Sequence, residues 1–341
     1  MNIDISNLKP LFATVPTVSS TLTAKDYLGT LKVRLAIGRG SYTVNPGLYA
    51  IGKPNSTSDV FVTANYKLSF DVVRQSLHGL NAWLLVLNTR GINVWCAAGK
   101  GLFGTNELLK QIDATSLKDI VSHRKLIVPQ LGAPGVAAHE VKKQSGFSVV
   151  FGPARATDIK AFVENGYRST PEMRTVTFTL RDRLTLMPVD IVLSSPYLLG
   201  LIVMLLLISG FGKEGYSLHD IFAESPQTIG LTLLGYLAGT VITPALLPYI
   251  PFRSFSAKGA AVAFLIFVAL YFFTPVFGGI VEAIAWLLIG TASASFVAMN
   301  FTGTSNYTSL SGVLKEMKYA IPMQVVVLVI GLILFVIHQF I

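Results

Sequence analysis

The sequence has 341 residues, of which 52% are hydrophobic, and it carries a formal net charge of +9 and a single cysteine. One cysteine excludes an intrachain disulfide and a cysteine-ligated cluster built from this chain alone. Up to residue 187 there are 22 Lys and Arg against 12 Asp and Glu, and beyond it there are 5 against 6. We therefore expect two domains, a basic soluble one at residues 1–187 and a charge-poor one at residues 188–341.

The basic balance of the first domain has two interpretations. Basic side chains can contact the anionic headgroups of membrane lipid, or they can attract a phosphate-bearing ligand. We expect no nucleic acid partner, because no basic stretch is interleaved with aromatic residues and no nucleic-acid-binding motif is present. The first ten residues lack the charged and apolar regions of a signal peptide, so the first domain is expected in the cytoplasm.

The first domain shows the alternation of predicted strands and helices that is typical of an α/β fold. An irregular arm is expected at residues 1–29, and residues 30–37 predict a strand because apolar and polar residues alternate there. Strands and helices of about ten residues then alternate, which favours a Rossmann-like parallel sheet with ligands at the carboxyl ends of its strands. The further strands are predicted at residues 47–51, 60–63, 82–88, 126–128, 147–151 and 174–180 (an edge strand), and the helices at 69–77, 104–112, 136–144 and 157–164.

The second domain is predicted to be an all-α transmembrane domain. It contains five stretches near the roughly 20 apolar residues that cross a bilayer, and the third and fourth are separated only by a tight Gly278-Gly279 hairpin. Its orientation follows from loop charge, because cytoplasmic loops carry the excess of Lys and Arg. Residues Arg253, Lys258, Lys315 and Lys318 lie in loops that share a side with the first domain. The predicted spans are residues 188–211, 228–250, 260–277, 280–299 and 321–340.

This charge pattern predicts a multi-pass protein of the cytoplasmic membrane. The first domain would be cytoplasmic and the C-terminus would lie outside.

The most informative stretch surrounds the cysteine, Asn-Val-Trp-Cys-Ala-Ala-Gly-Lys at residues 93–100. It follows a predicted strand, and Asn93 is a good N-cap, so Cys96 should lie in a first helical turn at the sheet edge. The unpaired N–H groups of such a turn and Lys100, four residues on, favour a thiolate. The residues after Cys96 have almost no side chain, so this helix could lie against a flat ligand and present a soft sulfur donor to its metal. The alternative is a small buried hydrophobe.

The same stretch resembles the cap-helix signature of the HgcA family, the corrinoid proteins of microbial mercury methylation. The soluble domain is also similar to the corrinoid-binding domain of the large subunit of corrinoid iron–sulfur proteins from the acetyl-CoA pathway. The resemblance covers about residues 30–187, and a tail of five spans fits the HgcA family. The other segments that carry it are residues 62–67, 103–108, 122–124, 129–135 and 151–155.

The resemblance implies a corrinoid-binding domain that holds a cobalamin-type cofactor with its tail displaced from cobalt. Cys96 would be the catalytic residue and the lower axial ligand of cobalt, and Thr63 matches a family threonine near the corrinoid. The other cofactor-binding residues implied by the cap helix are Asn93, Val94, Trp95, Ala97, Ala98, Gly99 and Lys100. Trp95 would shield the thiolate or pack in the core. The turns at Gly132, Gly135 and Gly152 lie at strand ends where a tail could thread, and simple turn chemistry is an equal alternative.

The activity implied is a methyltransferase that passes a methyl group from cobalt to Hg(II) and yields methylmercury. The chain cannot hold an iron–sulfur cluster with one cysteine, so the resemblance implies a separate [4Fe-4S] ferredoxin-like electron donor of the HgcB type. A methyl-donating methyltransferase is also implied. Two alternatives stay open: a membrane-bound corrinoid methyl carrier of one-carbon metabolism of the acetyl-CoA pathway type, and a corrinoid-binding transporter or sensor.

Overall fold

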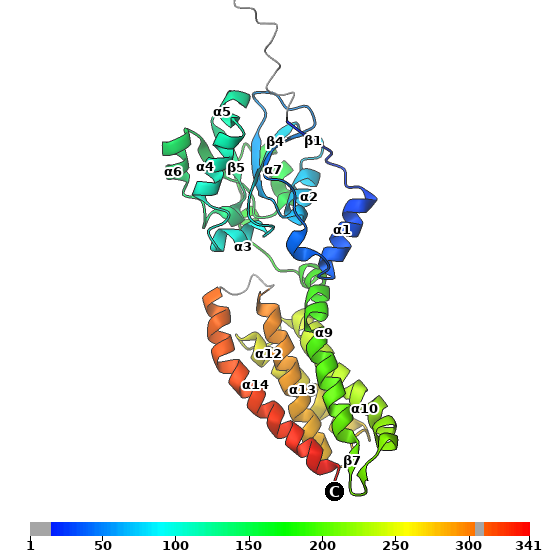
Figure 1. Ribbon diagram of the computed structural model, residues 1–341. Coiled ribbons are helices and arrows are strands. Elements are labelled where there is room, and N and C mark those ends of the chain that lie inside the picture. Colours follow the sequence, from blue (N-terminus) through cyan, green and yellow to red (C-terminus); the bar gives the residue numbers. More distant parts are fainter. Residues whose placement is uncertain (1–14, 304–309) are drawn as a thin grey trace, which may run out of the picture. The chain divides into compact units, whose positions relative to one another are not determined.

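A computed structural model describes residues 15–303 and 310–341 and divides the chain into two compact units (Figure 1). The boundary between them follows Thr177. The sequence places it after residue 187, but the first helix of the second unit, α9, already begins at Leu180. A capping box of Thr179 and Asp182 starts this helix ahead of its apolar stretch, which is the standard way to satisfy free N–H groups at a helix start.

The first unit contains a six-stranded sheet in the order β1-β2-β4-β3-β5-β6. The four strands β3 to β6 run parallel, whereas β2 is antiparallel to β4, so the sheet is mixed. Every residue of β3 and β4 is buried, as a parallel sheet covered on both faces requires. The strands are β1 (Thr17–Val18), β2 (Gly47–Ile51), β3 (Val60–Ala64), β4 (Ala82–Leu87), β5 (Lys125–Val128) and β6 (Ser148–Phe151).

Helices cover both faces of this sheet. Helices α4 and α6 lie on one side and α2 and α7 on the other (Figure 1). Side chains of β3 alternate between two cores: Val62 packs with the α4–α6 side, and Phe61 packs with the α2–α7 side. The helices are α2 (Lys67–Ser76), α3 (Val94–Gly99), α4 (Thr105–Ala114), α5 (Leu117–Ile120), α6 (Ala138–Ser145), α7 (Ile159–Glu164) and α8 (Pro171–Arg174).

Two strand predictions are wrong. Residues predicted as the strand 30–37 belong largely to helix α1 (Ala24–Arg34), of which only Val33 is buried. The apolar alternation there does not mark an inner and an outer face, because Leu31 and Ile37 are more than half exposed. The predicted edge strand at residues 174–180 is the end of α8 followed by irregular chain. Of the predicted arm, residues 1–14 lie outside the described residues, and the rest contains β1 and the start of α1.

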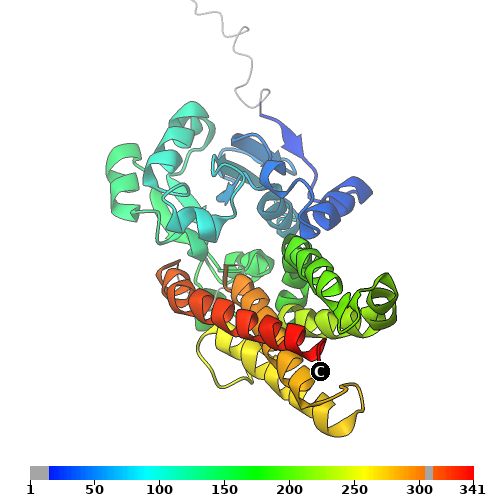
Figure 2. The ribbon, with the colours of Figure 1, turned by 60° about the horizontal axis from the view of Figure 1, so that its bottom comes forward.

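In the described part of the second unit, five helices are long and apolar enough to cross a membrane. Helix α13 lies at the centre of this bundle and packs against α10, α12 and α14 (Figure 2). Helix α10 continues through a π-helical turn at Ala238–Ile242 into the short α11 (Thr243–Leu246). The long helices are α9 (Leu180–Ser209), α10 (Leu218–Leu237), α12 (Phe255–Phe273), α13 (Ile280–Asn300) and α14 (Leu310–His338). They begin earlier than the predicted spans, except at α13, because polar first turns precede their apolar stretches.

The two ends of this bundle differ in charge. At one end, Lys213 in the hairpin between β7 (Phe211–Gly212) and β8 (Gly215–Tyr216) hydrogen-bonds to the carbonyl of Ile341. His338 lies 3.5 Å from Glu282 of α13 at the same end. At the opposite end, Arg183 and Lys258 donate to carbonyls of the α11 region. The basic residues of the bundle other than Lys213 belong to this second end: Arg181, Arg183, Arg253, Lys258, Lys315 and Lys318.

Candidate functional site

The carboxyl ends of β3 and β4 are joined by the side chain of Asn65. Its Oδ1 accepts hydrogen bonds from the backbone N–H groups of Thr89 and Gly91, both at 3.0 Å, and lies 2.9 Å from the Thr89 hydroxyl. Asn65 is 6% exposed and Thr89 is fully buried. This one amide therefore fixes the turn that leads from β4 into the next helix, α3.

Asn93 caps α3, as the sequence predicts. Its side-chain Oδ1 accepts from the Cys96 N–H at 2.9 Å. Val94, Ala97 and Ala98 face the core of the first unit, whereas Trp95, Gly99 and Lys100 are exposed and Cys96 is half-buried. The helix thus presents Cys96 on its outer face. Trp95 is 36% exposed, so core packing does not explain it.

Two of the small residues of α3 serve the packing of the helix. Ala97 and Ala98 are buried, so the predicted bare flank is not a continuous outer surface. Gly99 is the small residue that lies on the outer face, and a Cβ added to it would meet nothing within 4 Å. Open space beside a half-buried free thiol is what a bulky ligand of that sulfur needs.

Thr63 lies near the carboxyl end of β3 and carries an unsatisfied hydroxyl. The residue is fully buried, and its Oγ1 has no hydrogen-bond partner among the described residues. Strand β3 is also the point where the chain switches direction across the sheet, with β4 on one side and β5 on the other. Ligands of open α/β sheets bind at such switch points, and a buried orphan hydroxyl there fits a site that takes a polar partner.

Thr63 and α3 approach this edge from different faces. Thr63 shares the side of β3 that carries Phe61, which faces α2 and α7, while the buried residues of α3 pack with the opposite core. A ligand that touches both Cys96 and Thr63 must therefore straddle the carboxyl edge of the sheet. A wide planar cofactor meets that requirement.

The three predicted tail-binding glycines have packing reasons of their own. A Cβ on Gly132 would lie 2.4 Å from the ring of Phe103, and one on Gly135 would lie 2.1 Å from the Phe103 carbonyl. Gly135 also lies close to Ala98, so it brings the turn after β5 against α3. A Cβ on Gly152 would meet Ile127 at 3.1 Å. These contacts account for the glycines by close packing, and a role in tail binding stays a prediction.

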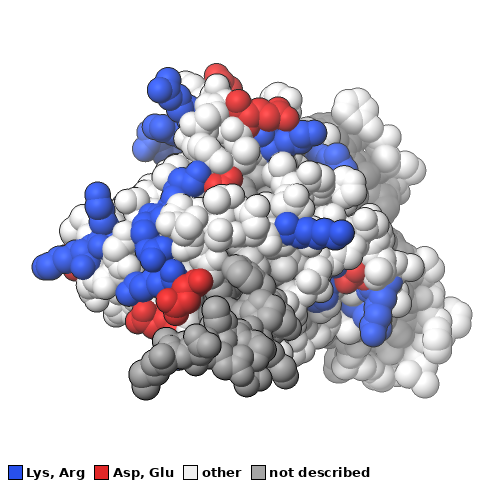
Figure 3. Space-filling view, turned by 90° about the horizontal axis from the view of Figure 1, so that it is seen from above, with Lys and Arg blue, Asp and Glu red and all other residues white. Residues whose placement is uncertain are grey.

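The first unit carries more basic than acidic side chains. On the face shown in Figure 3, Lys and Arg side chains stand in several groups with acidic groups between them. Near the site, Arg90 and Lys100 are exposed. Within the described residues, no group of three or more His, Cys, Asp or Glu side chains is placed to hold a metal ion.

Cys96, Asn93 and Thr63 are among the predicted site residues, whereas Asn65 is not. A polar residue directly after a mostly apolar, buried-type strand is the signal that could have found it, because such a residue is buried at the strand end and must have partners. Its role in holding the turn before α3 becomes visible only when β3 and β4 are paired.

The family comparison matches a stretch of the first unit. Residues 21–163 match the family model described as CO dehydrogenase/acetyl-CoA synthase delta subunit. This range runs from just before α1 to the end of α7 and includes the whole carboxyl edge with Thr63, Asn65 and Cys96. The helical bundle lies outside the match.

The curated relatives are subunits named acetyl-CoA decarbonylase/synthase complex subunit gamma. The one from Archaeoglobus fulgidus is 34% identical over 126 residues, covering 36% of this chain and 26% of the relative. That from Methanopyrus kandleri is 35% identical over 124 residues with the same coverage, and that from Methanocaldococcus jannaschii is 31% identical over 131 residues, covering 38% and 26%. The chain thus spans about a quarter of the length of these relatives. The similarity is to a stretch of a subunit from a complex whose printed name is acetyl-CoA decarbonylase/synthase.

Proposed function

We propose that this protein is a membrane-anchored corrinoid methyltransferase whose α/β unit binds the cofactor through Cys96. The observation that carries the proposal is the half-buried free thiol of Cys96, presented on the outer face of a capped helix beside the open space at Gly99. The orphan hydroxyl of Thr63 at the same sheet edge supports it. The relatives support methyl-carrying chemistry, because assembly of an acetyl group needs a one-carbon unit.

In this proposal each residue of the site has a physical task. The bound corrinoid supplies a cobalt ion that accepts and releases a methyl group. Cys96 would hold the cobalt ion of the cofactor through its sulfur, and Asn93 keeps the Cys96 backbone in place. Thr63 offers its hydroxyl to the cofactor, and Asn65 keeps the β4–α3 turn in register. The protein thus supplies ligand and placement while the cofactor supplies the reactivity.

Two methyl acceptors follow from different observations. The resemblance of residues 93–100 to the mercury-methylating family favours Hg(II), which would leave as methylmercury, with an HgcB-type [4Fe-4S] ferredoxin-like protein as reductant. The comparisons favour the other acceptor, a carbon centre of acetyl-CoA pathway metabolism. We propose Hg(II) as the acceptor, because the cap-helix resemblance is local to the residues that do the chemistry, and keep the carbon carrier as the second candidate.

A spectrum tests cofactor binding by itself. Full-length protein purified from corrinoid-replete cells should be coloured, and Cys96→Ala should shift its visible absorption without removing the colour, because the sulfur–cobalt bond is lost while the rest of the pocket remains. Lys118→Ala, a change of an exposed lysine on α5, serves as the matched control and should leave the spectrum unchanged. Colourless wild-type protein would contradict corrinoid binding.

Methyl transfer then separates the two acceptors. Methylated full-length protein is given either Hg(II) with a reduced ferredoxin-like partner or the acetyl-CoA synthase system. We expect the wild-type protein to form methylmercury in the first assay. The yield of methylmercury should fall to background with the Cys96→Ala variant. Transfer only in the second assay would establish the carbon carrier instead.

The charge of the two bundle ends supports a place in the cytoplasmic membrane. The end that carries Arg253 and Lys258 would face the cytoplasm together with the start of α9, and the end that carries Lys213 and Ile341 would lie outside. The chain that leads into α9 then also starts inside, so the first unit is cytoplasmic in this proposal.

A further inference from the structure

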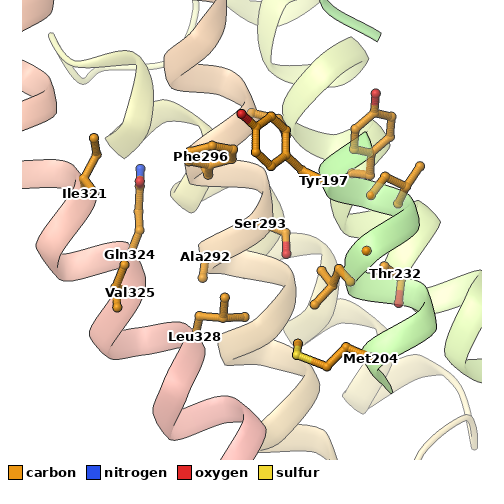
Figure 4. A pocket seen from close by; sticks show the side chains of 15 residues that line it. Tyr197, Met204, Thr232, Ala292, Ser293, Phe296, Ile321, Gln324, Val325 and Leu328 are labelled. Carbon is orange, nitrogen blue, oxygen red and sulfur yellow. The ribbon is translucent and has the colours of Figure 1, made fainter. Parts of the chain in front are cut away.

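A cavity of about 340 Å³ opens in the wall of the helical bundle (Figure 4). It lies among α9, α10, α13 and α14, and its surface is almost entirely hydrocarbon. A cavity of this size falls at the lower end of the range of small-molecule sites. Its lining includes Tyr197, Met204, Thr232, Ser293, Phe296 and Gln324.

One polar group in this cavity lacks a partner. The Gln324 side chain is 7% exposed, and its amide nitrogen donates to the Ser295 hydroxyl at 2.9 Å. Its amide oxygen has no hydrogen-bond partner among the described residues. If the amide oxygen and nitrogen were exchanged, the oxygen would accept a hydrogen bond from the Ser295 hydroxyl and the nitrogen would have no partner. Either placement therefore leaves one polar atom of the Gln324 amide without a hydrogen bond.

The two aliphatic hydroxyls of the cavity lining have already used their protons. The hydroxyl of Ser293 donates to the Ile289 carbonyl at 2.8 Å, and that of Thr232 donates to the Thr228 carbonyl at 2.6 Å. An ordered water needs two to four polar partners and a polar site, which the surroundings of the Gln324 amide do not provide. The cavity is therefore suited to an apolar molecule with a single polar atom.

The position of the cavity at the outer wall of the bundle indicates where such a molecule would come from. The cavity is half open, and its helices α9 and α14 expose most of their apolar stretches to the outside of the bundle. Both helices contain a proline beside the cavity, Pro196 and Pro322, and proline in a helix interior removes a backbone hydrogen bond and bends the helix. In a bilayer such an opening faces hydrocarbon chains.

We infer that this cavity is a specific lipid site, in which a hydrocarbon chain lies along Met204 and Phe296 and a hydroxyl of the lipid hydrogen-bonds to the Gln324 amide. The inference concerns the membrane unit alone and does not depend on what Cys96 binds. It rests on insertion of the bundle in a bilayer, and its test reports that insertion separately.

The test uses full-length protein in lipid nanodiscs that contain a trace of a long-chain alcohol with a photoreactive diazirine in its chain. After illumination, peptides are mapped for crosslinks at the cavity and at Leu265, which is 66% exposed on α12. Crosslinks at Leu265 report ordinary lipid around an inserted bundle. The inference expects crosslinks at Met204 and Leu328 to exceed those at Leu265 at least fivefold.

Two glycines give a matched pair of variants. Gly200 lines the cavity and Gly230 lies on α10 outside it, and a Cβ added to either would meet nothing within 4 Å. Gly200→Phe should abolish the excess of cavity crosslinks, because the ring takes the space of the chain, and Gly230→Phe should preserve it. Equal crosslinking at the cavity and at Leu265 in the wild type, or a cavity excess that survives Gly200→Phe, would overturn the inference.

Gln324→Leu tests the polar contact. A hydrogen bond of this kind contributes about 0.5–1.5 kcal/mol, or roughly a twofold to tenfold change in occupancy. The variant should lower cavity crosslinking by the alcohol probe by that factor and leave crosslinking by a probe that ends in a methyl group unchanged. An unchanged alcohol signal would remove the hydroxyl from the proposed ligand and so overturn the inference as stated.

Discussion

At the scale of single residues, the buried hydroxyls of Thr63 and Thr89 differ in their hydrogen bonding. Both are fully buried near the carboxyl edge of the sheet, but only the hydroxyl of Thr89 has partners. A buried polar group without a partner costs about 1–3 kcal/mol. Thr63→Val should therefore raise the thermal midpoint of the cofactor-free protein, whereas Thr89→Val should lower it.

The same pair should behave differently toward the cofactor. Thr63→Val removes the hydroxyl that we assign to the corrinoid, so the amount of corrinoid retained on purification should fall. If the Thr63→Val protein has a lower thermal midpoint than the wild type and still retains the full amount of corrinoid, the assignment of this hydroxyl to the cofactor is contradicted.

Asn65 holds the turn between β4 and α3, the helix that carries Cys96. Asn65→Ala leaves the buried N–H of Thr89 and that of Gly91 without their acceptor, which should lower the free energy of unfolding by about 1–3 kcal/mol. Hydrogen–deuterium exchange of the segment from Thr89 to Gly99 should accelerate at the same time. Asn88→Ala is the control, because Asn88 is exposed and accepts only one long bond, from Arg90 at 3.2 Å. Equal effects of the two changes would deny Asn65 this role.

Much of the site could be read from the sequence because its signals are local. The cap at Asn93 and the position of Cys96 in the first turn depend on a few neighbouring residues, and both are present in the structure. The orientation of Ala97 and Ala98 could not be read, since it depends on the turn at Gly135, which is distant in sequence and packs against α3. The unsatisfied state of Thr63 likewise follows from strand pairing rather than from any local pattern.

At the scale of elements, helix α1 is held to α2 by a compact set of ion pairs. Asp26 of α1 lies 2.6 Å from Lys67 and 2.9 Å from Arg74, and Asp71 contacts the same two cations. Burial by itself raises the pKa of Asp26, but hydrogen bonds from its neighbours, Lys67 first, lower it well below its ordinary value. The pKa of Lys67 is raised, because the bonds to the two aspartates outweigh its own burial.

These shifts set a pH window for the docking of α1. The folded pKa of Asp26 lies below its unfolded value of about 3.9, so its stabilisation is present above that pH and is lost as the pH falls further. The raised pKa of Lys67 keeps its contribution in place up to about pH 10.4. Asp26→Asn should therefore lower the thermal midpoint at pH 7, and the difference from wild type should shrink below pH 4. A difference that stays constant between pH 7 and pH 3 would exclude this account.

Helix α1 also explains why its segment misled the sequence analysis. The alternation of apolar residues around Leu31 has the period of a strand, but the cap formed by Thr23 and Asp26 starts a helix. Ion pairs to α2 then hold the helix in place with only Val33 buried. The pattern could not reveal this, because the partners of Asp26 lie more than forty positions along the chain.

In the bundle, the π-helical turn after α10 packs closely onto α13 through a glycine. A Cβ on Gly239 would lie 2.2 Å from Val297 and 2.5 Å from the Ala294 carbonyl. Gly239→Ala should therefore force the helices apart and destabilise the protein by about 1–3 kcal/mol, measured as a lower thermal midpoint in detergent. Gly230→Ala, where the added methyl meets open space, should leave the midpoint within error. A tolerated Gly239→Ala would mean that this contact is looser than described.

At the scale of the whole molecule, composition alone separated the two units and located five apolar helices. The division worked because charge density and apolar run length are properties of long stretches and average over local errors. The predicted boundary between the units lies later than the start of α9. The first residues of α9 are charged, so composition assigns them to the soluble domain, although their backbone is helical and continuous with the apolar stretch. The apolar cavity beside Gln324 could not be foreseen, because it arises from the packing of four helices.

The single cysteine makes the proposed orientation directly measurable. In a Cys96→Ala background, Lys213→Cys and Arg253→Cys place one thiol at each end of the bundle, in loops rather than in spans. With an excess of basic residues at the Arg253 end, the positive-inside rule puts that end in the cytoplasm. A membrane-impermeant maleimide should then label Lys213→Cys in intact spheroplasts and label Arg253→Cys only after permeabilisation. In wild-type protein produced without corrinoid, so that no cobalt occupies the sulfur, Cys96 should be labelled in the same way as Arg253→Cys, because the chain enters α9 from the basic end. The reverse pattern would place the proposed chemistry outside the cell, away from a cytoplasmic reductant.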